Sequence, residues 1–180
     1  MTELIAPPAQ DEYAQHYAGY VARVAGGDLR SILGQQLDAL RVLIAPVSEE
    51  EGSTGYAPGK WSIKEVLGHI ADTERVMSYR LLCIARGDTT PLPGFEQDDY
   101  VAIARANERT LESLMTEVAA VRAGTLALVE SLGAEAWARR GVANQHEVSA
   151  SALAHIIAGH LEHHVAIFRE RYGLGAPRPE

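Results

Sequence analysis

The chain has 180 residues, of which 47% are hydrophobic and 22% are charged, and its formal net charge is -8 at pH 7. This length and composition predict one folded domain with a sizeable core rather than a disordered chain. The negative charge argues against a nucleic-acid-binding surface, because such a surface needs lysine and arginine side chains to neutralise phosphates.

The two ends of the chain are expected to be poorly ordered. We interpret residues 1–12 as a disordered extension, residues 13–173 as a single domain, and residues 174–180, "LGAPRPE", as a flexible tail. The opening residues lack the features of a signal peptide, and the apolar runs are far shorter than the roughly 20 residues that cross a bilayer. Because Cys83 is the only cysteine, no internal disulfide can form. We therefore expect a cytoplasmic protein without membrane association.

The first part of the chain predicts two helices and a loop. Residues 11–24 favour a short helix that ends at a pair of glycines. Residues 28–45 favour a longer helix with Asp28 as N-cap and apolar residues three and four positions apart. Residues 48–60 contain acidic residues, glycines and a proline, which predict a loop.

A long helix is predicted over "WSIKEVLGHIADTERVMSYRLLCIARG". Ser62 followed by Glu65 fits a capping box at its start, and Trp61 is expected to anchor the core there. The prolines and glycine of "DTTPLPGFEQDDY" predict a loop after this helix. In that loop, Asp98 and Asp99 are expected either to cap the next helix or to line the mouth of a pocket.

The remainder of the chain predicts two further helical regions. Residues 100–132 favour a long helical region with a break near Asn107, and residues 134–148 favour one helical turn followed by a loop. The last helix is expected to begin after an N-cap at Ser149 or Ser151. No segment alternates polar and apolar residues over the length of a strand. The predicted fold is therefore all-α, an up-down four-helix bundle with short extra helices.

The last predicted helix contains a cluster of histidines in the sequence "HIIAGHLEHH". Because an α-helix turns by about 100° per residue, His160 and His164 point to the same side, which is also the apolar side. His155 lies roughly 140° away from His160 and cannot join this pair without distortion. We expect His155 to be solvated or to lie beside a site, and His163 to lie at its rim.

Two histidines do not make a specific metal site, and a catalytic site usually has three protein ligands. His69 is the best third candidate, because it lies within a predicted helix beside the apolar stripe. His16 and His146 lie near a chain end and in a predicted loop. If the two helices pack side by side, the nitrogens of His69, His160 and His164 converge and leave a coordination position open. Taken singly, each of these histidines can also be an ordinary core residue.

Four further residues are candidates for orienting the ligands or lining a pocket: Glu65, Asp72, Glu74 and His163. The alternatives are that Asp72 is solvated and that Glu74 pairs with an arginine in the bundle. No catalytic base is identified. The segment "HLEHH" does not match the H-E-x-x-H pattern of zincin proteases, and the E-x-x-H pattern of di-iron bundles does not occur in the sequence.

The segments "YAPGKWSIKEVLGHIADTERVMSYRLLCIARGD", "PLPGFEQDDY" and "HIIAGHLEHHVAIF" resemble the DinB-like family of metal-dependent enzymes, also called the YfiT-like group. The resemblance extends over about residues 56–172. It implies a four-helix bundle whose metal ligands are His69, His160 and His164, the same set that the helical geometry selects. It also implies one divalent ion, which is zinc or nickel with iron as a further option. The expected partners are a small-molecule substrate, such as a low-molecular-weight thiol, and a second copy of the chain in a homodimer.

Two classes of function stay open at this point. A metal held by neutral histidines can lower the pKa of a bound water or hold a thiol as thiolate. The leading expectation is therefore a metal-dependent enzyme that acts on a small molecule in a thiol transferase-like or hydrolase-like reaction. The alternative is a non-catalytic bundle whose metal site is structural or senses a ligand. An open coordination position would favour the enzyme.

Overall fold

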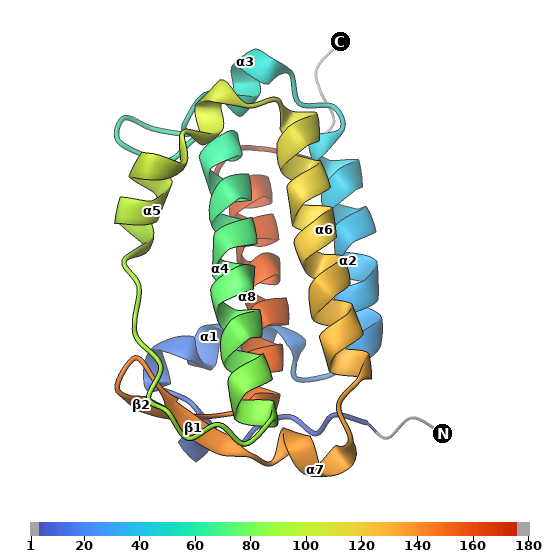
Figure 1. Cartoon of the computed structure of the whole chain (residues 1–180). Coiled ribbons are helices and arrows are strands. Elements are labelled where there is room, and N and C mark those ends of the chain that lie inside the picture. The colour runs from blue at the N-terminus through green and yellow to red at the C-terminus, as the bar shows by residue number, and fades with distance from the viewer. Residues whose placement is uncertain (1–3, 176–180) are drawn as a thin grey trace.

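The computed structural model describes residues 4–175 (Figure 1). Its main elements are four long helices: α2 (Leu29–Ile44), α4 (Ile63–Ala85), α6 (Leu111–Glu130) and α8 (Ala150–Glu170). Helix α4 packs against α6 and α8, and α2 packs against the same two helices to close the bundle. This arrangement confirms the predicted all-α fold class. None of the described helices combines the length and the hydrophobicity needed to cross a membrane.

Shorter helical elements connect and cover the bundle. They are α1 (Ala18–Val24), α3 (Glu49–Gly52), α5 (Gln97–Ala104), α7 (Ala134–Trp137), and three 3-10 turns at Gln10–Glu12, Gln15–Tyr17 and Ala106–Glu108. The helix expected over residues 11–24 is thus divided into 3-10 turns and α1. The expected break near Asn107 corresponds to the 3-10 turn that separates α5 from α6.

The structure contains a β-hairpin where the sequence predicts a loop. Strands β1 (Arg140–Ala143) and β2 (His146–Ser149) pair in antiparallel fashion. Asn144 and Gln145 form the turn with φ angles of 49° and 66°, and a type I′ hairpin requires positive φ at both positions. The prediction of no strand in this region was wrong, because strands this short show no clear alternation and glutamine is not a typical residue of such turns.

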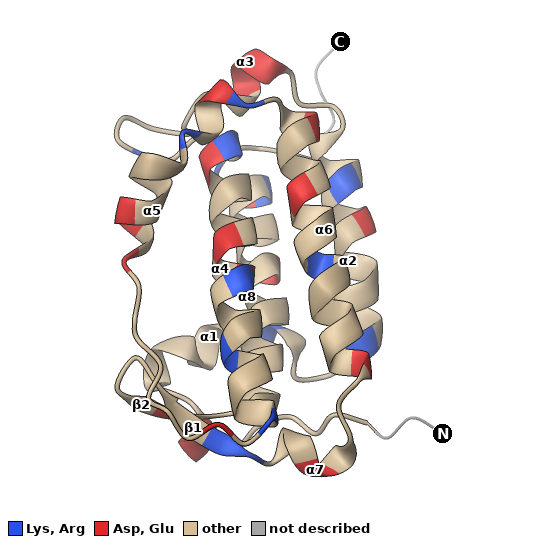
Figure 2. Cartoon of the chain, viewed as in Figure 1, with Lys and Arg blue, Asp and Glu red and all other residues tan. Residues whose placement is uncertain are grey.

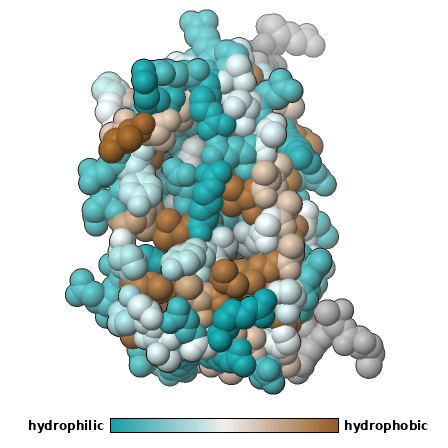
Figure 3. Space-filling view, in the orientation of Figure 1, coloured by the Kyte–Doolittle hydropathy of each residue, from teal (hydrophilic) through white to brown (hydrophobic). Residues whose placement is uncertain are grey.

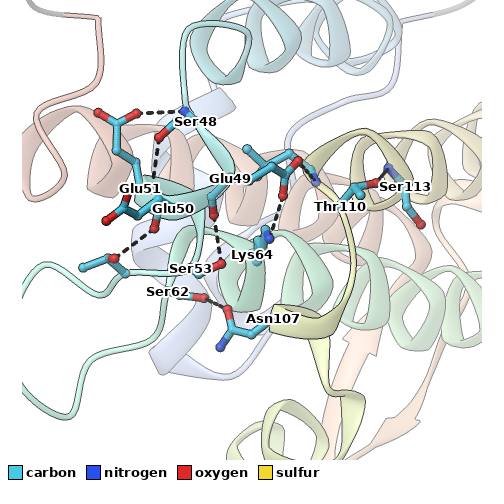
Figure 4. A network of polar contacts seen from close by, with 12 residues as sticks. Ser48, Glu49, Glu50, Glu51, Ser53, Ser62, Lys64, Asn107, Thr110 and Ser113 are labelled. Atoms are coloured by element: carbon cyan, nitrogen blue, oxygen red, sulfur yellow. Dashed lines mark hydrogen bonds and ion pairs between the residues drawn. The ribbon is translucent and has the colours of Figure 1, made fainter.

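Helices α4 and α6 run in the same direction, because the chain returns along the outside of the bundle through α5 (Figure 1). The predicted up-down order of the long helices is therefore wrong for this pair. Polar contacts hold their first turns at one end of the bundle (Figure 4). The carboxylate of Glu49 in α3 accepts from Lys64 Nζ at 2.6 Å and from the backbone N–H of Leu111 at 2.9 Å. Ser62 also donates from Oγ to Asn107 Oδ1 at 2.6 Å. Helix α3 therefore joins the starts of α4 and α6.

A side-chain N-cap begins each long helix. Asp28, Ser62, Thr110 and Ser149 accept from the backbone N–H three residues later. The predicted capping box of α4 is present, since the Glu65 carboxylate accepts from the backbone N–H of Ser62. These caps satisfy backbone donors that have no partner inside the helix.

A buried polar network joins all four long helices. Arg122 of α6 donates from Nε and Nη2 to the two carboxylate oxygens of Glu74 in α4, each at 2.8 Å. Its Nη1 donates to two groups of α2, the carbonyl oxygen of Leu33 at 3.0 Å and Gln36 Oε1 at 2.8 Å. Gln36 in turn donates from Nε2 to the carbonyl oxygen of Ala158 in α8 at 2.9 Å. We call these contacts the Arg122 network.

Parts of the predicted extension and tail belong to the described residues. At the start of the chain, Ile5 is buried and Gln10–Glu12 form a 3-10 turn. At the other end, Leu174 packs against the core and donates its backbone N–H to Phe168 O at 3.0 Å. Residues 1–3 and 176–180, which are included in these two predictions, lie outside the described residues.

Candidate metal centre

Three imidazole rings meet between α4 and α8. His69 comes from α4, and His160 and His164 lie one turn apart on α8. The Nε2 atom of His160 lies 3.0 Å from Nε2 of His69 and 3.1 Å from Nε2 of His164. One nitrogen from each ring lies within 4.8 Å of the other two. We call these three residues the histidine triad.

All three rings of the triad are buried. The exposed fractions are 4% for His69 and 6% for His160 and His164. Burial disfavours the charged imidazolium, and the neighbouring histidines add repulsion. Together these effects lower the pKa of His69 to about 4 and hold the pKa values of His160 and His164 well below their usual range. The rings are therefore neutral near pH 7 and carry nitrogen lone pairs.

The arrangement of the nitrogens fits a divalent cation. Converging lone pairs repel one another, and a cation between them would satisfy all three. Tetrahedral zinc, with Zn–N bonds of about 2.0–2.1 Å, holds its nitrogen ligands roughly 3.3 Å apart, which is close to the observed spacing. The Nδ1 atom of His69 lies 3.4 Å from Thr73 Oγ1, and a proton on Nδ1 leaves Nε2 free as a ligand. The triad could therefore hold one metal ion, and zinc, nickel and iron all suit such ligands.

Aromatic side chains pack against the triad. Tyr20 of α1 contacts His160 edge-on, with ring centroids 5.5 Å apart, and Trp61 contacts His69 with centroids 4.9 Å apart. Tyr20 comes so close because residue 159 is glycine: a Cβ atom on Gly159 would lie only 2.0 Å from the Tyr20 carbonyl oxygen. Trp61 is half-buried and contributes to the core, as the sequence predicts, but it also faces the site. The role of Tyr20 has no signal in the sequence pattern.

Two cavities reach the triad. The first has a volume of about 420 Å³, and its walls include His69, His164, His163, Trp61, Lys60 and Tyr172. The second has a volume of about 400 Å³, and its walls include His160, Thr73, Met77, Arg80, Phe95 and Ile156. Tyr20, Gln97 and Asp98 line both cavities. Asp98, which belongs to the first turn of α5, thus takes the pocket position considered in the sequence analysis. Figure 3 shows the surface hollowed below α5, with apolar residues along part of the edge.

Three carboxylates expected beside the metal ligands have other partners. Glu65 turns back to the N-cap of its own helix, and Glu74 belongs to the Arg122 network. Asp72 pairs with Arg75 at 3.1 Å, and both side chains are partly exposed to solvent. Figure 2 shows acidic and basic residues on the visible side of α4. The interpretation that these carboxylates orient the ligands or line the pocket is therefore corrected. For Glu74, the alternative of an arginine partner is the one that the structure shows.

The remaining histidines occupy different places. His155 is buried rather than solvated, and its Nδ1–H donates to the Ser151 carbonyl oxygen at 2.8 Å. It is not part of the triad, as the helical geometry predicts. His163 is half-buried and lines the first cavity. His16 lines the second cavity, and its ring centroid lies 5.9 Å from that of His146.

Comparisons with known proteins point to one family. The sequence profile described as the DinB superfamily matches residues 32–168. A curated protein of Geobacillus thermodenitrificans, named as a candidate metal-dependent hydrolase, is 26% identical over 95 residues, which are 53% of each chain. A similarly named protein of Oceanobacillus iheyensis is 26% identical over 121 residues, which are 67% of this chain and 69% of that protein. The match thus spans about half the length of the first relative and about two thirds of the second.

Two solved structures share the fold. YfiT from Bacillus subtilis, described as a candidate metal-dependent hydrolase with an unusual four-helix bundle topology, has a TM-score of 0.73 at 13% identity. That comparison covers 92% of this chain and 93% of YfiT. The mycothiol-dependent maleylpyruvate isomerase has a TM-score of 0.66 at 14% identity, over 82% of this chain and 60% of the isomerase. At these identities the similarity is evidence of the fold alone.

Proposed function

Because the chain belongs to the DinB superfamily, we propose that it is an enzyme that holds one divalent metal ion with the histidine triad and acts on a small molecule. The observation that carries the proposal is the convergence of three buried, neutral imidazole nitrogens that two cavities reach. A structural zinc site is closed by four protein ligands. Among the described residues only the triad forms a candidate group of metal ligands, and this supports a site with room for substrate.

Hydrolysis is the reaction that the names of the curated relatives support. A divalent ion bound by the triad would supply Lewis acidity, which lowers the pKa of water or of a thiol. The chain's own residues hold the ligand rings neutral and oriented, and the aromatic rings of Tyr20 and Trp61 limit access of bulk water. Asp98 and His163 also line the first cavity and are the candidates for proton transfer there.

Transfer of a low-molecular-weight thiol is the second candidate reaction. The two cavities reach different members of the triad, and this arrangement offers space for a thiol and for a second reactant. One solved structure with the same fold is a mycothiol-dependent isomerase, and this makes a low-molecular-weight thiol a reactant to test.

The experiment that tests this function compares hydrolysis with thiol transfer in the same preparations. Protein treated with a chelator and reloaded with zinc, nickel or iron is assayed with a panel of esters and amides. The same protein is then assayed with low-molecular-weight thiols and an electrophile. We expect turnover in one of the two panels, restored by metal and abolished by His160→Ala. Turnover that persists after chelation and in the His160→Ala variant would contradict the proposal, and so would stoichiometric metal without turnover in either panel.

A further inference from the structure

A second buried arginine differs from Arg122 in having no carboxylate partner among the described residues. Arg80 of α4 is only 3% exposed. Its Nη2 donates to the Pro93 carbonyl oxygen at 2.6 Å, its Nη1 contacts Met77 Sδ at 3.5 Å, and its guanidinium lies 5.9 Å from the Phe95 ring centroid. A guanidinium has five N–H donors, and these neighbours include one carbonyl oxygen and one weak sulfur acceptor. The charge is therefore buried without a compensating anion, which is energetically unfavourable.

This arginine lines the second cavity, which also reaches His160 of the triad. Arg80 follows His69 on α4 by eleven positions, which corresponds to a rotation of about 20° and a rise of about 16 Å, so both residues lie on the same face of the helix. Thr73 and Met77 lie between them and line the same cavity. Helical side chains lean toward the N-terminus. The guanidinium is therefore on the order of 10 Å from the triad.

The walls of the second cavity suit an organic anion. Tyr17, Phe95 and Ile156 supply apolar and aromatic surface. Glu96 and Asp98 also line the cavity, but both are exposed to solvent and neither forms an ion pair with Arg80. Solvent and salt screen such exposed charges, whereas they screen a buried guanidinium much less. A cavity that combines apolar and aromatic surface with one buried arginine suits a carboxylate attached to an apolar body.

We propose that Arg80 determines substrate specificity by binding the carboxylate of an organic acid in the second cavity. The carboxylate accepts hydrogen bonds from the guanidinium, while the other end of the molecule, on the order of 10 Å away, extends to the histidine triad. Only the assignment of that other end as the reacting end rests on the proposed metal-dependent function.

The test uses 4-phenylbutyrate as probe and 4-phenylbutyramide as its uncharged counterpart. Calorimetric titration is carried out on the full chain as purified, and metal content is measured on the same sample. We expect the acid to bind at least about 10-fold more tightly than the amide, because hydrogen bonds to charged groups are the stronger ones. Arg80→Gln should abolish this preference. The matched control, Arg86→Gln, alters an exposed arginine of the same helix region that bonds to Ser131, and it should keep the preference.

Equal binding of the two probes by the natural chain, or a preference for the acid that survives Arg80→Gln, would overturn the proposal. A role of Arg80 limited to holding the loop at Pro93 would lower the melting temperature without changing the preference, and that result would also overturn it. If Arg80→Gln does not fold, the proposal is tested instead with the Arg80→Lys variant and with the NMR signal of the Arg80 Nε–H in the natural chain. The acid, but not the amide, should shift that signal, and Arg80→Lys should weaken binding of the acid alone. Binding through Arg80 in protein that takes up no zinc, nickel or iron on reloading would contradict the metal-dependent function and leave this inference standing.

Discussion

Replacing Glu74 by glutamine should destabilise the protein more than most single substitutions. Glutamine keeps the shape of the side chain but removes the charge that compensates Arg122, whose exposed fraction is 1%. It also turns an amide N–H₂ group, a donor, toward guanidinium donors that now make two bonds of 2.8 Å to the carboxylate. Breaking a buried pair by removing one partner costs about 3–5 kcal/mol. For a domain of this size, that loss lowers the melting temperature by roughly 6–20 °C.

Thermal and urea unfolding followed by circular dichroism measure this effect. The double variant Glu74→Leu with Arg122→Met removes both charges and should be more stable than Glu74→Gln, because no uncompensated charge stays buried. The control is Asp38→Asn, which breaks the exposed pair with Arg41 and should cause no measurable loss. A melting temperature of Glu74→Gln equal to that of the Asp38→Asn control would refute the reasoning.

The other predictions also concern stability. Gly159→Ala places a Cβ atom 2.0 Å from the Tyr20 carbonyl oxygen and should cost at least about 1–3 kcal/mol by displacing α1. Gly124→Ala, at an open position of α6, should instead stabilise the protein by up to about 1 kcal/mol. Equal changes in melting temperature for the two variants would contradict this account. Ser62→Ala removes the N-cap of α4 and should cost about 1 kcal/mol in urea unfolding, whereas no change would show that the cap is dispensable. For the metal-free protein, the pKa of His69 is lowered from 6.5 to about 4 by burial, so the unfolded chain binds more protons between these values. The free energy of unfolding therefore has its full contribution from His69 above about pH 6.5 and falls by roughly 3 kcal/mol as the pH drops to about 4. A free energy of unfolding in urea that stays constant across this range would argue against buried neutral rings.

The long helices could be predicted because each one has apolar residues three and four positions apart and begins at a recognisable cap. The spacing of apolar residues and Ser62 followed by Glu65 are enough to indicate α4 before any tertiary contact is known. The hairpin could not be predicted in this way, since two backbone positions with positive φ define it and not a long alternating pattern. The parallel direction of α4 and α6 depends on how the segment with α5 crosses the bundle, and hydrophobic periodicity contains no information about that path.

The candidate site was partly predictable for a similar reason. Two histidines four residues apart on one helix must share a face, so His160 and His164 follow from helical geometry alone. Glu74 was expected beside the metal ligands because it is close to His69 in the sequence. Its actual partner, Arg122, lies on another helix, and sequence spacing cannot reveal such a contact. Arg80 gave no signal either, since a single arginine in an amphipathic helix is usually solvated. That the triad binds metal stays a prediction.

Metal analysis of untagged protein by mass spectrometry tests the central claim most directly. The natural chain should retain about one divalent ion per chain, as a single three-histidine site predicts. His69→Ala, His160→Ala and His164→Ala should each lose most of it. His155→Gln alters a buried histidine of α8 outside the triad and should retain the ion, with circular dichroism confirming that all variants fold. Stoichiometric metal in folded protein that lacks all three triad histidines would contradict the account.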